Sequence, residues 1–359
     1  MIVRESGILL PVSSLPSRYG IGSFSKEAYE FIDFLKKAGQ KKWQVLPLGP
    51  TSYGDSPYQS FSTFAGNPYF IDLDALIGWG LLGREECESF DFGQDEECVD
   101  YGKLYEARSS ILRLAYDRFS AENNEDYLKF CQENAYWLED YSLFMVLKDM
   151  HGGKSWNQWE EPFRDRWPDA IFKLRETAAQ EIGFYWFQQY MFRKQWESLH
   201  RYAAQNGIEI VGDIPIYVAL DSADTWANPE LFQFGKNHEP IAVAGCQPDA
   251  FSTTGQLRGN SLYDWEYHRR TEYRWWISRV AYCLNLYDIL RVDHFRGFDA
   301  YYSIPAGDQT AENGHWEKGP GKELFRALRE SLGEMNIIAE DLGYLTDSVI
   351  DLVLSLIHI

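Results

Sequence analysis

Two short apolar runs that end abruptly in an acid constrain the fold of this chain more than any other feature. Residues 291–298 read RVDHFRGF and residues 337–343 read IIAEDLG, which places Glu340 47 positions after Asp293. An apolar run that stops at charged groups and a glycine is typical of a buried parallel strand. The two runs therefore predict a parallel sheet that carries two carboxylates at the carboxyl ends of its strands.

Strand-like runs alternate with helical patterns along the chain, which predicts successive βα units. Strands are expected at 7–15, 43–48, 208–218, 289–295 and 336–342, and helices at 25–38, 103–120, 124–150, 181–205, 267–286, 322–332 and 346–354. No GxGxxG sequence follows any of these strands, so a dinucleotide-binding sheet is not favoured. Five units in order fit the first five-eighths of a (β/α)8 TIM barrel, an α/β fold, better than an open doubly wound sheet.

The spacing of the strands predicts a division into three parts. Residues 1–75 would hold barrel strands 1–2 and their loops, and residues 76–180 a large, mainly helical insertion. Residues 181–359 would hold strands 3–5, interrupted by a loop-rich insertion at 219–265. The reason for this division is that the second and third strands lie about 160 residues apart, against roughly 30 for one ordinary βα unit.

Charge and composition exclude several classes of partner. A formal net charge of −20 disfavours binding to nucleic acid or to an anionic membrane surface, so a neutral substrate is expected. The five cysteines are scattered without CxxC spacing, which indicates neither a disulfide framework nor a zinc site. Neither a leader pattern nor an apolar run of about 18 residues is present, and we therefore expect a cytoplasmic protein.

A third acid, Asp213, lies at the carboxyl end of the third predicted strand, so three acids are expected on the catalytic face of the barrel. One interpretation is a divalent-metal cage of carboxylates. Against a metal, Arg291 lies two residues before Asp293 and points the same way, where it competes with a cation. The other interpretation is glycoside chemistry, with Asp293 as an ionised nucleophile and Glu340 as general acid and base. We favour the second, with no metal and no cofactor.

The order of several motifs gives the chain a family resemblance. The motifs are LPVSSLP at 10–16, WQVLPL at 43–48, GDSPYQS at 54–60, GNPY at 66–69, GDIPIYV at 212–218, DAFS at 249–252 and the two acid-ended strands. In these residues the chain resembles the 4-α-glucanotransferases (amylomaltases or disproportionating enzymes) of glycoside hydrolase family 77, over residues 7–353. The resemblance implies a cofactor-free transferase that acts on malto-oligosaccharides and on starch- or glycogen-derived glucans.

The resemblance also implies roles for individual residues. Asp293 would form a covalent glucosyl intermediate, Glu340 would act as acid and then base, and Arg291 would orient Asp293. The residues implied to bind the sugars are Ser56, Tyr58, Asp213, Asp249 and His294. Three departures from the family pattern are Arg258, where a tryptophan is usual, and Ser261 and Gln247, where a proline is usual. Losing the indole at 258 puts one stacking contact in doubt.

Alternatives remain at this point. An α-glucan hydrolase on the same scaffold, and a non-catalytic glucan-binding fragment, fit the same motifs. The last residues, LSLIHI at 354–359, do not continue the helical pattern of 346–354 and resemble a translated sequencing adaptor. We therefore expect a truncated reading frame in which the C-terminal part of the barrel and the family's third catalytic aspartate are missing. A chain with such an open sheet edge is expected to be poorly soluble or inactive when expressed alone.

Overall fold

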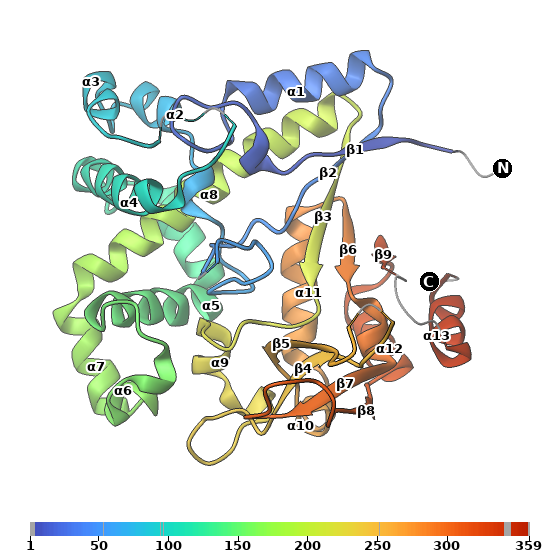
Figure 1. Ribbon diagram of the computed structural model, residues 1–359. Helices are drawn as coiled ribbons and strands as arrows, with labels where there is room; N and C mark the ends of the chain where they lie inside the picture. The colour runs from blue at the N-terminus through green and yellow to red at the C-terminus, as the bar shows by residue number, and fades with distance from the viewer. Residues whose placement is uncertain are drawn as a thin grey trace. The chain divides into compact units, whose positions relative to one another are not determined.

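The computed structural model describes residues 4–52, 54–93, 95, 97–250, 252–340 and 346–357. The chain divides into two compact units (Figure 1). Unit 1 comprises Met1–Pro57, Ala65–Met150 and Trp167–Val211, and unit 2 comprises Tyr58–Phe64, His151–Arg166 and Gly212–Ile359. Within the described ranges, no helix is long and apolar enough to cross a membrane.

Unit 1 is mainly helical. Its elements are β1 (Gly7–Leu9), η1 (Val12–Ser14), α1 (Lys26–Lys37), β2 (Lys42–Gln44), η2 (Pro68–Phe70), α2 (Leu73–Gly78), α3 (Arg84–Glu88), α4 (Tyr101–Arg118), α5 (Glu125–Met150), α7 (Pro168–Thr177) and α8 (Ala179–Gln205). The strand β3 (Glu209–Pro215) begins in unit 1 and ends in unit 2.

Unit 2 contains the remaining strands. Its elements are η3 (Trp156–Gln158), α6 (Glu161–Arg164), α9 (Ala223–Ala227), η4 (Pro229–Leu231), β4 (Ala242–Cys246), β5 (Gln256–Ser261), α10 (Trp265–Arg270), α11 (Arg274–Leu286), β6 (Ile289–Asp293), η5 (Phe295–Phe298), β7 (Ala300–Pro305), β8 (His315–Lys318), α12 (Lys322–Leu332), β9 (Ile337–Ala339) and α13 (Asp347–Ile357).

The predicted parallel sheet is confirmed. Its strand order is β1-β2-β3-β6-β9, so the strands follow one another in space as they do along the chain. The pairs β1–β2, β2–β3 and β6–β9 are parallel, and β6 opposes β9 with Val292 facing Ala339. In Figure 1 the arrowheads of β3 and β6 lie side by side and point the same way. This is the succession expected of the first five strands of a barrel, and over the described residues the sheet stays open.

Helix α1 illustrates how the sequence sets the helices. Ala28, Ile32 and Leu35 recur at helical spacing and are fully buried. Gly39 follows the helix with φ of +72°, a left-handed backbone that ends a helix at little steric cost in glycine. The same reasoning predicts α12 correctly at both ends, and α4, α5 and α8 within a few residues.

A second sheet was not predicted. It is antiparallel, with the order β5-β4-β7-β8, and two of its strands lie in the segment 219–265 that was expected to be rich in loops. That expectation is wrong for β4 and β5, and the pair β7–β8 had no sequence-based prediction at all. The strands are short, contain Gly245 and Gly259, and shift register between Val243 and Gly245. Such strands lack the clear alternation of apolar and polar residues that identifies a strand from sequence.

Two predicted helix boundaries are also wrong. The single helix expected at 267–286 is two helices, because Glu272 and Tyr273 both adopt left-handed φ of 56°. No glycine or proline marks this break, so the usual sequence signals do not report it. At the other end, α13 continues to Ile357, so the helical pattern does not stop at residue 354. Residues 53, 251, 341–345 and 358–359, which include parts of three quoted motifs or segments, lie outside the described residues.

We predict that Gly212→Ala destabilises the protein by about 1–3 kcal/mol, the usual cost of overpacking a core. A Cβ at Gly212 would lie 2.1 Å from Cδ2 of the buried Tyr287 ring, which would have to move. The matched control is Gly78→Ala in α2, where a Cβ meets nothing within 4 Å. Urea denaturation measures both, and a Gly212→Ala protein as stable as the control would contradict the packing argument.

Candidate active site

Three acids meet at the carboxyl ends of the parallel strands in unit 2. Asp213 lies near the end of β3, Asp293 is the last residue of β6, and Glu340 directly follows β9. The sheet continues to Glu340, whose N–H donates to the carbonyl oxygen of Val292 at 3.2 Å. Because parallel strands end at one edge, their last side chains come together, as the sequence predicted.

The guanidinium of Arg291 joins the three carboxylates. Its Nη1 lies 2.6 Å from Asp213 Oδ1, and its Nη2 lies 3.0 Å from Asp293 Oδ1 and 3.3 Å from Glu340 Oε1. Burial lowers the pKa of Arg291, but the hydrogen bond to Asp213 and the three negative charges outweigh burial and raise the pKa above its usual value. Arg291 therefore stays charged, and its guanidinium lies at the position where a cage of these three carboxylates would hold a metal ion.

Asp213 is the most buried of the three acids. It is 1% exposed, and each of its carboxylate oxygens has a partner: Arg291 donates to Oδ1, and the Tyr58 hydroxyl donates to Oδ2 at 2.7 Å. Burial raises the pKa of Asp213, while the hydrogen bonds from Tyr58 and Arg291 oppose that rise. The side chains of Asp293 and Glu340 are 27% and 17% exposed, which leaves them more accessible to a reacting molecule.

His294 contributes through its backbone, a role that the sequence did not reveal. Its φ of 55° is left-handed, and its N–H donates to Glu340 Oε2 at 2.6 Å. Glu340 is therefore held at Oε1 by Arg291 and at Oε2 by this N–H. The only sequence signal is the residue type, since histidine is among the residues enriched in left-handed backbone.

The imidazole ring of His294 is neutral near pH 7. Burial lowers its pKa to about 4, and the positive charges of Arg258 and Arg296 act in the same direction. The ring lies 6.1 Å from the ring of Tyr217, between centroids. Arg258, on the exposed side of β5, is thus near enough for its charge to act on the ring that the family resemblance places at the sugar.

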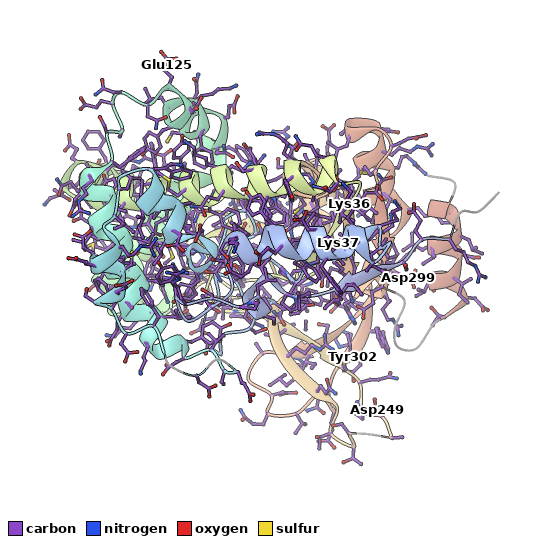
Figure 2. All side chains as sticks on the ribbon, turned by 90° about the horizontal axis from the view of Figure 1, so that it is seen from above. Lys36, Lys37, Glu125, Asp249, Asp299 and Tyr302 are labelled. Carbon is purple, nitrogen blue, oxygen red and sulfur yellow. The ribbon has the colours of Figure 1, made fainter. Side chains whose placement is uncertain are left out.

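The structure groups Tyr58, Asp213, Arg291, Asp293, His294 and Glu340 within unit 2. Ser56 belongs to unit 1. Asp249 is exposed on the connection from β4 to β5, where its Oδ1 accepts from the Ser252 N–H at 2.8 Å (Figure 2). Sugar binding by Ser56 and Asp249 therefore stays a prediction from the sequence.

We predict that Arg291→Met lowers the free energy of unfolding by about 3 kcal/mol at pH 7, because it leaves the buried Asp213 without its cation. Without Arg291 the pKa of Asp213 lies still further above its unfolded value. The variant's deficit should therefore grow as pH rises and shrink as pH falls and Asp213 becomes protonated. Denaturation at several pH values measures this change.

The control is the double variant Asp213→Asn/Arg291→Met, in which the buried charge is absent. Its deficit should depend on pH less than that of Arg291→Met, because the remaining Asp293 and Glu340 carboxyl groups are partly exposed. A pH-independent deficit in Arg291→Met itself would contradict the assignment of the loss to Asp213.

Comparisons with known proteins point to one family. The profile of glycoside hydrolase family 77, described as 4-alpha-glucanotransferase, matches residues 10–356. The chain is 51% identical to the 4-alpha-glucanotransferase of Clostridium butyricum over 341 residues, covering 95% of this chain and 70% of that protein. It is 47% identical to the Thermus thermophilus 4-alpha-glucanotransferase over 350 residues, covering 96% and 69%.

Among solved structures, the amylomaltase of Streptococcus agalactiae in complex with acarbose matches with a TM-score of 0.96 and 42% identity. That match covers 99% of this chain and 72% of the other. The sheet order, the profile match and these identities lead to one conclusion: the chain belongs to the 4-alpha-glucanotransferases of glycoside hydrolase family 77.

Proposed function

We propose that Asp293 and Glu340 transfer α-1,4-glucan segments between malto-oligosaccharides by a retaining double displacement. One observation carries the assignment: Nη2 of Arg291 contacts an oxygen of each carboxylate, at 3.0 and 3.3 Å. Those two oxygens are therefore no further apart than the sum of these distances, 6.3 Å. Retaining glycosidases place their carboxyl groups about 5–5.5 Å apart and inverting ones about 6.5–9.5 Å, and the upper limit for these two oxygens lies below the inverting range.

The first displacement breaks the glycosidic bond. A carboxylate oxygen of Asp293 attacks the anomeric carbon, while Glu340 donates its proton to the leaving oxygen, which departs as the 4-hydroxyl of the released glucan. In the second displacement Glu340 takes the proton from the 4-hydroxyl of an acceptor glucan, whose oxygen replaces Asp293 at the anomeric carbon. Both displacements invert the carbon, so the α configuration returns. Arg291 orients Asp293 for the attack through its contact with Asp293 Oδ1 at 3.0 Å.

The remaining predicted residues would bind the sugar. Asp213 and the imidazole of His294 would bind hydroxyls of the glucose residue at the cleavage point. Ser56, Tyr58 and Asp249 would contact the neighbouring glucose residues of the glucan. The position of Tyr58 and His294 beside the acids supports their part in this proposal. The acarbose complex of the Streptococcus agalactiae relative agrees with an oligosaccharide substrate, and the net charge of −20 agrees with a neutral one. We further propose a cytoplasmic location, supported by five cysteines that are all unpaired.

Variants of the two acids should separate their roles. Asp293→Asn is expected to abolish both reactions of the enzyme, with maltotriose and with an α-maltotriosyl fluoride donor, because no covalent intermediate can form. Glu340→Gln should lower turnover of maltotriose by about 10²–10⁴-fold, the usual contribution of general acid catalysis. Fluoride leaves without a proton, so this variant should still react with the fluoride donor and accumulate a glycosyl adduct. Peptide mass mapping should find that adduct on Asp293.

The charge-matched control is Glu334→Gln, an exposed glutamate before β9, which should leave activity unchanged. An adduct on another residue, or an equal loss with both donors in Glu340→Gln, would contradict the assignment. Product analysis separates the alternatives. Constant reducing ends with redistributed glucan lengths indicate transfer, rising reducing ends indicate an α-glucan hydrolase, and unchanged glucans indicate binding alone. EDTA is expected to have no effect.

A further inference from the structure

The mechanism leaves several buried charged side chains of unit 2 without a role, and the most buried of them is the guanidinium of Arg279. Arg279 lies on α11 and is 2% exposed. Its Nη2 donates to the carbonyl oxygen of Pro215 at 2.5 Å, and its Nη1 donates to the carbonyl oxygen of Ile216 at 3.1 Å. One planar group thus holds two consecutive backbone carbonyls.

Tyr263 also holds one of these carbonyls, and we call Arg279 and Tyr263 together the clamp. Its hydroxyl donates to the same Ile216 oxygen at 2.7 Å and accepts from Arg279 Nη1 at 3.2 Å. The guanidinium carbon lies 4.9 Å from the centroid of the buried Trp276 ring. Because a guanidinium is rigid and planar, these contacts fix both the place and the orientation of the two carbonyls.

The clamped carbonyls lie between two parts of the candidate active site. Asp213 precedes Pro215 by two residues, and Tyr217, whose ring approaches that of His294, follows Ile216 directly. β3 ends at Pro215, which has no N–H to donate to a neighbouring strand. At this end of the strand the backbone is held by the hydrogen bonds from Arg279 and Tyr263 and, in the part of the chain that the structure describes, no longer by pairing with a neighbouring strand.

The segment that carries Tyr58 is tied down nearby by Asp224. This buried carboxylate accepts from the Thr63 N–H at 2.8 Å and from the Thr63 hydroxyl at 2.7 Å. Burial raises the pKa of Asp224, whereas the Thr63 hydrogen bonds and the positive charge of Arg279 lower it. Arg279 and Asp224 therefore act on the two segments that supply the Tyr58–Asp213 hydrogen bond.

We propose that Arg279 is a positioning residue for the transfer reaction, acting through Pro215 and Ile216 on Asp213; the inference rests on the proposed function. A buried guanidinium is costly to desolvate, and the hydrogen bonds of Arg279 go to two carbonyl oxygens and the Tyr263 hydroxyl. A neutral donor would satisfy one carbonyl at lower cost. Only a forked donor fixes two adjacent carbonyls relative to each other, which is the geometry that the placement of Asp213 requires.

The test compares Arg279→Lys with Arg108→Lys. Arg108 is a matched control, since it is 1% exposed in unit 1 and donates in the same way to two carbonyls, those of Ile71 at 3.1 Å and Tyr69 at 2.7 Å. All variants are made in the Glu340→Gln background, in which the adduct accumulates, and the measured quantity is the rate of adduct formation at saturating α-maltotriosyl fluoride, per folded molecule. A purely structural role changes the folded fraction but not this rate.

We expect Arg279→Lys to lower the rate about 10–100-fold, the range that small misplacements of reacting groups produce, and Arg108→Lys to change it less than about twofold. Tyr263→Phe, which removes one donor and keeps the ring, should lower it about 3–10-fold and decides the matter if Arg279→Lys does not fold. Rates equal to that of the Glu340→Gln parent overturn the inference while leaving the proposed function intact. A Glu340→Gln parent that forms no adduct overturns the proposed function and this inference with it.

Discussion

The contact of one guanidinium with three carboxylates is the constraint on which the site depends. Negative charges on Asp213, Asp293 and Glu340 at the same strand ends repel one another. Arg291 lies within 3.3 Å of an oxygen of each and supplies the positive charge that allows them to gather. Because Arg291 precedes Asp293 by two residues on β6, the alternation of the strand itself directs both side chains to the same face.

Burial then distinguishes acids that the sequence cannot tell apart. Asp213 has both oxygens occupied and almost no exposed surface, so it can orient groups but is poorly placed to form a bond. Asp293 and Glu340 each keep exposed surface, and Glu340 is further held by the His294 N–H. The assignment of nucleophile and acid to the latter two thus agrees with accessibility, which is a property of the folded chain and not of any motif.

Sequence reasoning succeeded where a residue's role follows from position along one strand. The alternation at Arg291 and Asp293 and the succession of acid-ended strands are enough to predict the acid cluster from the sequence alone. It failed where the role depends on backbone conformation or on distant partners. His294 acts through its backbone N–H, which a left-handed φ directs to Glu340. The helix break at Glu272 and Tyr273 contains no glycine or proline that would mark it. The antiparallel sheet has strands too short and irregular to identify by periodicity.

Arg279 is another residue whose role depends on distant partners and could not be predicted from the sequence. In the sequence it is one cation within an amphipathic helix, a pattern that usually indicates a solvated face. In the structure it is buried against Trp276 and donates to the carbonyl oxygen of Ile216, which lies 63 positions earlier and directly follows β3. The apolar residues around it are what make the contact rigid, because they exclude the water that would otherwise compete for the two carbonyls. Arg279 can therefore position Asp213 without contacting a substrate. It can do so only because the fold brings the aromatic core around α11 against the end of β3.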